Sequence, residues 1–169
     1  IYLINLKGKS MLKLILLVMT ISTLLGEGKF SGLVFYDYAH NLSEDADGYN
    51  AFSLSRVYLT YQQNLSENIS YKFQTDIDPG ATPKEVYLKN AKVDWQSPIG
   101  KLTIGLQGMN VFNITEKTWG HRFLEKSPMD KHGFASSADM GVGYFGTFSE
   151  VHYSLLITNG AGYKKNEND

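Results

Sequence analysis

The sequence predicts an all-β chain whose antiparallel strands, connected up and down, form part of a transmembrane β-barrel. Three observations carry this prediction: apolar and polar side chains alternate along most of the chain, short and long connections alternate, and Tyr and Trp lie beside the short connections. The 169 residues include 11 Tyr and 9 Phe but only 4 Pro, a composition that favours strands over helices.

The clearest alternation lies in the hairpin of residues 56–77, which reads RVYLTYQQNLSENISYKFQTDI. In its second arm Ile69, Tyr71 and Phe73 alternate with Ser70 and Lys72, and a period of two sends side chains to opposite faces of a strand. The first arm repeats the pattern, and a polar turn at 63–68 joins the two arms. One face of the hairpin is therefore apolar and the other is charged.

The same pattern recurs along the chain and predicts seven strands. Their lengths are close to the roughly 9–11 residues that a tilted strand needs to cross a bilayer. The predicted strands are 29–40, 51–62, 69–78, 86–96, 101–109, 136–146 and 151–159.

The connections between these strands alternate in length. Those at 63–68, 97–100 and 147–150 are short, whereas those at 41–50, 79–85 and 110–135 are mostly longer and more charged. Outer-membrane barrels have this asymmetry, with tight periplasmic turns and larger external loops. A soluble sandwich has no reason to sort its loops in this way.

Aromatic residues on the apolar face lie within about three residues of a short turn, as expected of an interfacial girdle in which a ring is buried and its polar atom is wet. Chance placement in a half-buried sheet is the alternative. The residues are Tyr61, Tyr71, Trp95, Tyr144 and Tyr153, with Phe30 similarly placed at the start of the first strand.

The opposite faces of the strands are predicted to line water. Cross-strand pairing of their charges is the alternative to a role in guiding ions. The predicted pore-lining residues are Arg56, Lys72, Asp76, Lys92, Asp94 and Lys101, and Asp37 and Asp139 share this face.

Residues 11–28 have the pattern of a secretory signal peptide, because Lys13 precedes a short apolar run that ends in small residues. A buried core helix is the alternative. Residues 1–10 precede a plausible start methionine, and residues 29–169 then form the N-terminal part of the barrel, since seven strands alone leave two unpaired edges. The chain has no cysteine, and its net charge of -1 excludes a general nucleic-acid surface.

The order of these features resembles a known family. The signal peptide is followed by GKFSGLVFYDY, then RVYLTYQQNLSENISYKFQTD, YLKNAKVDW, GKLTIGLQG, a loop containing EKTWGHRFLEKSPMD, and YSLLITNGAGYKK. In this order the chain is similar to the N-terminal part of a bacterial outer-membrane porin of the phosphate-selective porin O and P group.

The resemblance implies a water-filled barrel, usually trimeric, that admits small hydrophilic solutes by passive diffusion, with its third external loop folded inward as a constriction. By position, residues 110–135 are that loop. Relatives that select anions have arginine-rich lumens, whereas this chain contains only Arg56 and Arg122, so phosphate selectivity is not carried over.

The charges of the 110–135 segment fit either a selective narrowing or a solvated surface loop, because rings of charge at a constriction set the selectivity of a pore. Trp119 and Phe123 are candidate anchors to the barrel wall. The predicted constriction residues are Glu116, Lys117, His121, Arg122, Glu125, Lys126 and Asp130.

No cofactor, metal site or catalytic residue is predicted, because His121 and His132 lack a third ligand and no nucleophile and base pair stands out. The predicted function is passive diffusion of small hydrophilic solutes or ions, among them anions, through a homotrimeric porin embedded in outer-membrane lipid. The alternatives are an outer-membrane enzyme, a small structural barrel without a conducting pore, and a soluble exported β-sandwich that binds carbohydrate.

Overall fold

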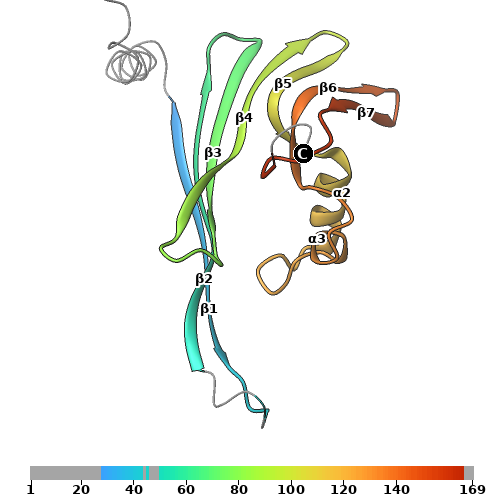
Figure 1. Ribbon diagram of the computed structural model, residues 1–169. Coiled ribbons are helices and arrows are strands. Elements are labelled where there is room, and N and C mark those ends of the chain that lie inside the picture. Colours follow the sequence, from blue (N-terminus) through green and yellow to red (C-terminus); the bar gives the residue numbers. More distant parts are fainter. Residues whose placement is uncertain (1–27, 44, 46–49, 166–169) are drawn as a thin grey trace, which may run out of the picture.

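The computed structural model describes residues 28–43, 45 and 50–165, which form one seven-stranded antiparallel sheet (Figure 1). Each strand pairs with its neighbours in sequence, in the order β1 to β7. The strands are β1 (Lys29–His40), β2 (Asn50–Asn64), β3 (Ile69–Asp78), β4 (Glu85–Ser97), β5 (Gly100–Gly108), β6 (Ala138–Phe148) and β7 (Val151–Thr158). The predicted signal peptide and residues 1–10 lie outside the described residues, apart from Gly28.

The all-β, up-and-down arrangement is confirmed. Each observed strand begins and ends within two residues of its predicted bounds. Within the described residues β1 and β7 do not pair with each other, so the sheet is open and does not close into a barrel.

The two faces of the sheet differ as the alternation predicts. One continuous row of paired residues crosses five strands on the apolar face: Tyr71, Val93, Ile104, Val142 and Ile157. The four aliphatic side chains in this row are 42–72% exposed. Such a row of exposed aliphatic side chains is unusual, and nothing in the described part of the chain covers it.

The opposite face, called the polar face below, carries four buried polar side chains, whereas Ile77 and Leu106, each 7% exposed, are buried on the apolar face. Thr103, Gln107 and Asp139 are at most 3% exposed, and Asp76 is completely buried. Lys72 and Lys92 lie directly opposite each other on this face in neighbouring strands. For these residues and the exposed aliphatic row, the usual placement of apolar residues inside and polar residues outside is reversed.

Two β-bulges shift the alternation. The register slips between Gln74 and Thr75, so that Gln74 pairs with Asn90 whereas Thr75 pairs with Leu88, and Lys89 becomes an extra residue in β4. A second slip follows Phe35, which pairs with Arg56 on the polar face. The extra residue of this slip is Ser55 in β2, so the alternation of β1 itself continues without interruption.

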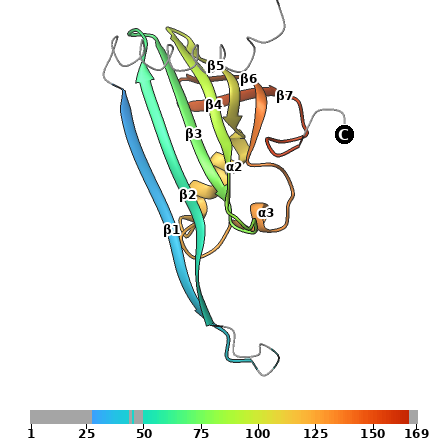
Figure 2. The same ribbon diagram turned by 60° about the vertical axis from the view of Figure 1, so that its left-hand side comes forward.

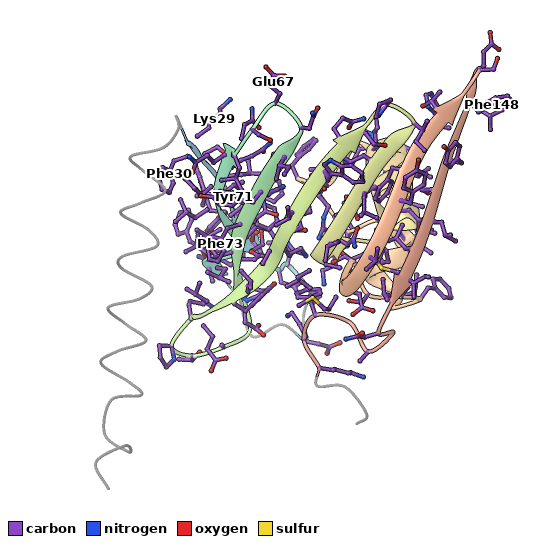
Figure 3. All side chains as sticks on the ribbon, turned by 90° about the horizontal axis from the view of Figure 1, so that it is seen from above. Lys29, Phe30, Glu67, Tyr71, Phe73 and Phe148 are labelled. Carbon is purple, nitrogen blue, oxygen red and sulfur yellow. The ribbon has the colours of Figure 1, made fainter. Side chains whose placement is uncertain are left out.

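The short turns gather at one end of the sheet and the longer connections at the other (Figure 1). Seen from above, Glu67 and Phe148 lie at the tips of two short turns, and side chains project from both faces of the strands (Figure 3). Between β5 and β6 the chain leaves the sheet and folds into two helices, α2 (Asn110–Trp119) and α3 (Pro128–Lys131). Figure 2 shows both helices on the concave side of the curved sheet.

Local sequence explains both helices. Asn110 is the first residue of α2, and its side-chain oxygen accepts a hydrogen bond from the Val111 N–H, which has no partner within the helix. Gly120, at a φ of 67°, ends α2 by returning its N–H to the carbonyl of Glu116. Pro128 supplies the first residue of α3, where its fixed φ suits a helix start.

The position of Gly105 in β5 predicts that a side chain there would disturb the pairing of β5 with β4. Its φ of 119° is disfavoured for other residues, and an added Cβ would lie 2.3 Å from the carbonyl oxygen of Ala91 in β4. We expect Gly105→Ala to lower the free energy of unfolding by about 1–3 kcal/mol, measured by urea titration with intrinsic fluorescence. Gly32→Ala is the matched control, because a Cβ there meets only the Tyr58 carbonyl oxygen at 3.6 Å and should change stability little. Equal effects at both glycines would contradict the claim.

Candidate functional site

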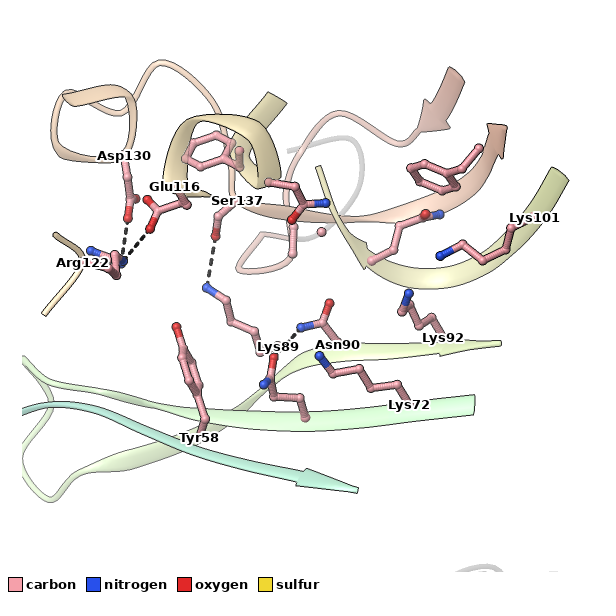
Figure 4. A pocket seen from close by; sticks show the side chains of 17 residues that line it. Tyr58, Lys72, Lys89, Asn90, Lys92, Lys101, Glu116, Arg122, Asp130 and Ser137 are labelled. Atoms are coloured by element: carbon pink, nitrogen blue, oxygen red, sulfur yellow. Dashed lines mark hydrogen bonds and ion pairs between the residues drawn. The ribbon is translucent and has the colours of Figure 1, made fainter. Parts of the chain in front are cut away.

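A polar cavity of about 440 Å³ lies between the polar face of the sheet and helix α2. Five cationic side chains but only two carboxylates, Glu116 and Asp130, line it. Figure 4 shows Arg122 beside Glu116 and Asp130 at one end of the cavity, Lys89 near the middle beside Ser137, and the other lysines toward the opposite end. The cations are Lys72, Lys89, Lys92, Lys101 and Arg122.

The lysines differ in how their charge is balanced. Lys92 forms an ion pair of 2.9 Å with Asp94, whose other oxygen accepts a hydrogen bond from Thr103. Lys101 lies 5.1 Å from the centre of the Phe145 ring. Within the described residues Lys72 has no carboxylate within 4.0 Å, so its charge faces the cavity without an ion pair.

Arg56 and Asp76 form a buried ion pair on the polar face. The Arg56 Nη1 lies 2.6 Å from the Asp76 Oδ2, and the Tyr87 hydroxyl donates to the same oxygen at 3.0 Å. The other oxygen of Asp76 accepts the backbone N–H groups of Val57 and Ile77. With four donors in all, Asp76 joins β2, β3 and β4 at one point.

A second ion network holds the 110–135 segment in shape. Arg122 pairs with Glu116 at 3.0 Å and with Asp130 at 2.9 Å, and Ser127 donates to Glu116 at 2.7 Å. The Arg56 Nη2 lies 4.0 Å from the Asp130 Oδ2. Arg56 is therefore the point at which the segment's network meets that of the sheet.

A second cavity of about 700 Å³ lies on the far side of Arg122, toward the long connections. Arg122, Asp130 and Ser137 line both cavities, so the two spaces meet at these residues. A third, smaller cavity of about 110 Å³ lies at the short-turn end and is lined by Glu67, Asp94 and Lys101, among others.

The predicted pore-lining residues all lie on the polar face, but they are not equally accessible. Lys72 and Lys92 line the first cavity, Lys101 the first and third, Asp94 the third and Arg56 the second. Asp76 was expected to line water, and this expectation is corrected: four hydrogen-bond donors surround its carboxylate, which is 0% exposed.

The predicted constriction residues divide in the same way. Glu116 lines the first cavity, Glu125 and Lys126 the second, and Arg122 and Asp130 line both. Lys117 and His121 line none of the three cavities. Hydrogen bonds from the Lys131 side chain and from the Lys126 backbone N–H lower the pKa of Glu125, which favours its charged form.

The expected wall anchors, Trp119 and Phe123, do not hold the segment to the sheet. The Trp119 indole N–H donates to the Glu125 carbonyl within its own segment, and Phe123 is 66% exposed. Phe112, at 2% exposure, is the buried residue of helix α2. Phe112 lies near the start of the helix, where the chain leaves β5.

The sequence did not single out Lys89 and Tyr163. Strict alternation from Asn90 and Lys92 puts Lys89 on the apolar face, but the bulge in β4 turns it to the polar face. There its Nζ donates to Ser137 at 3.1 Å and to the Tyr163 hydroxyl at 3.2 Å. Burial raises the pKa of Tyr163, but the Lys89 ammonium together with the hydrogen bonds of Lys89, Tyr87 and Ser137 leaves this pKa below its ordinary value.

Aromatic residues gather on the apolar face near the short turns. The rings of Phe30 and Tyr61 lie 4.6 Å apart and those of Tyr61 and Tyr71 lie 5.7 Å apart. The hydroxyls of Tyr61 and Tyr71 both donate to the side chain of Gln63 at 2.8 Å. Each phenol thus keeps its ring on the apolar face and its polar atom bonded near the turn.

Two further findings concern the described residues only. They include no group of three or more His, Asp or Glu side chains arranged to hold a metal ion. They also include no helix with the length and apolar character needed to cross a membrane. Comparison of the chain with protein-family models, with curated proteins and with solved structures found no significant match.

The buried position of Asp76 predicts a stability effect that a surface carboxylate would not show. Asp76→Ala removes the partner of Arg56 and leaves that charge buried, so we expect a loss of about 3–5 kcal/mol in the free energy of unfolding. Asp37→Ala is the matched control on the same face, since the exposed Asp37 accepts one hydrogen bond from Ser53. Urea titration of both variants tests the difference, and equal stability of the two would refute the role given to Asp76.

Proposed function

We propose that the chain is part of an outer-membrane porin, in which the sheet is one wall of a water-filled channel for small hydrophilic solutes or ions. The observation that carries the proposal is the reversed sidedness of the sheet. Aliphatic side chains such as Ile104 and Ile157 are more than half exposed on one face, while Thr103 and Asp76 are buried on the other. A transmembrane barrel needs this arrangement, because lipid covers its outside and polar groups line its inside.

The aromatic cluster at the short-turn end supports a membrane boundary there. Tyr and Trp favour the interface because the ring is apolar while the hydroxyl or N–H bonds to polar groups. Trp95 and Tyr144 lie in one cross-strand row of the apolar face, together with Ile69, Leu102 and Leu155. In the proposed orientation this end of the sheet faces the periplasm.

The 110–135 segment supports the placement of the passage. Its helices lie on the polar side of the sheet, and the cavities lie between the segment and the strands. Arg122 and Asp130 stand where the two larger cavities meet. In the proposed channel these residues form the constriction, and the excess of cations over carboxylates in the first cavity favours anions.

A barrel without a conducting pore is the second candidate function. The observation that favours it is the ion network of Arg56, Asp130, Arg122 and Glu116, which ties the segment to the wall on the polar side. A segment held in this way can close a passage as well as narrow it. Conductance separates the two candidates.

Site-directed labels test which face meets lipid. We expect spin labels on Phe73→Cys, Ile104→Cys and Val142→Cys to be reached by oxygen in the acyl chains, and a label on Lys72→Cys to be reached by a water-soluble nickel chelate. Power-saturation EPR in lipid vesicles measures both accessibilities. Phe73 and Lys72 are neighbours in β3, so they form a matched pair that differs only in face. A water-exposed label at all three apolar positions would remove the membrane assignment.

Conduction tests the function itself. We expect the intact protein to give discrete current steps in a planar lipid bilayer. Under a salt gradient, we expect its reversal potential to have the sign of an anion-selective channel. Lys72→Glu should move this reversal potential toward cations, because it reverses a cavity charge that has no ion-pair partner among the described residues. Lys117→Glu is the control, since Lys117 lines none of the cavities. Membranes without current steps would favour the non-conducting barrel.

A further inference from the structure

The two larger cavities carry different balances of charge, and they meet at Arg122, Asp130 and Ser137. The first lies toward the short turns, and the second lies toward the long connections. In a channel, a solute that enters at one end passes through them in succession. The charge of each cavity therefore acts at a different point along the path.

The first cavity has an excess of positive charge beyond the shared Arg122 and Asp130. Asp94 neutralises Lys92, but the other three lysines have no carboxylate partner within 4.0 Å among the described residues. Lys89 donates to two hydroxyls, Lys101 lies over the Phe145 ring, and Lys72 faces the cavity. Glu116 is the one further carboxylate of this cavity, and it pairs with Arg122.

The second cavity is closer to balance. Its lining cations are Arg56, Arg122, Lys126, Lys164 and Lys165, and its lining carboxylates are Asp37, Asp78, Glu125 and Asp130. Asp130 lies 4.0 Å from Arg56, and Lys164 lies 3.7 Å from Asp78. Lys126 and Lys165 line this cavity without an ion pair in the described part of the chain. Asp37 also lines it and contributes a negative charge. The net positive charge of the passage is thus concentrated on its short-turn side.

We propose that this asymmetry makes the channel rectify, passing more current when anions enter from the short-turn side. This inference rests on the proposed function. At this voltage anions enter the cationic first cavity easily from the short-turn side. Cations move in the opposite direction and are repelled by the first cavity before they can leave the channel. Both ions therefore accumulate in the channel, and its conductance rises. With the voltage reversed, the same cavity depletes the passage of ions and conductance falls.

The test is the ratio of single-channel currents at equal positive and negative voltage, with the intact protein in a planar bilayer at low salt. The side of entry is fixed by Glu67→Cys at the tip of a short turn, because a membrane-impermeant thiol reagent labels it from one side only and this chain has no other cysteine. The expected result is a ratio that differs from one, with the larger current for anions moving away from the labelled turn.

Three variants assign the effect to the cavities. Lys72→Gln combined with Lys101→Gln should bring the current ratio to one, because the pair removes two charges without leaving a carboxylate unpaired. Lys126→Gln, in the second cavity, should move the ratio further from one. Lys117 lines none of the three cavities, so Lys117→Gln should leave the current ratio unchanged.

The outcomes separate this inference from the function on which it rests. A wild-type channel with a ratio of one, a larger current in the opposite direction, or a double variant that still rectifies would overturn the asymmetry while leaving the porin in place. An intact protein that gives no current steps would overturn the proposed function and this inference together.

Discussion

The structure depends on the two-residue period of the β-strand, applied to seven strands in a common register. Residues that pair across two strands point to the same face of the sheet. Once one residue of a strand lies on the apolar face, its partners in the adjacent strands lie on that face too. Val93, Ile104 and Val142 follow one another across β4, β5 and β6 in this way. A slip of one residue would exchange the faces of a whole strand, so the register fixes both the apolar face and the polar face of the sheet.

The polar face meets its own requirement through ion networks rather than apolar packing. Buried charges are costly unless they are paired and hydrogen-bonded. Asp76 meets this condition with four donors, and Arg122 meets it with two carboxylates of its own segment. Arg56 lies between these groups, so one ion network supports both the sheet and the 110–135 segment.

Alternation and turn chemistry sufficed to predict the strands, their order and the side of the sheet on which Lys72, Lys92 and Lys101 lie. They did not predict Lys89, because one inserted residue reverses the parity of a strand and leaves no mark in the sequence. They also could not tell an accessible charge from a buried one. Asp76 and Asp94 look alike in an alternating strand, and three of the four donors around the buried Asp76 come from the neighbouring strands β2 and β4. Residue type alone also does not show which aromatic side chain packs: Phe112 is buried, whereas Phe123 is exposed.

Pairing between sequential strands also has a consequence for assembly. Each pair of neighbouring strands in the described sheet is joined by one connection. The conformational entropy lost when that connection is closed into a loop therefore stays small at each step. The longest of these closures, between β5 and β6, spans the helical segment. Strands can then be added one hairpin after another from either end, and the β5–β6 closure becomes the slowest link in that succession.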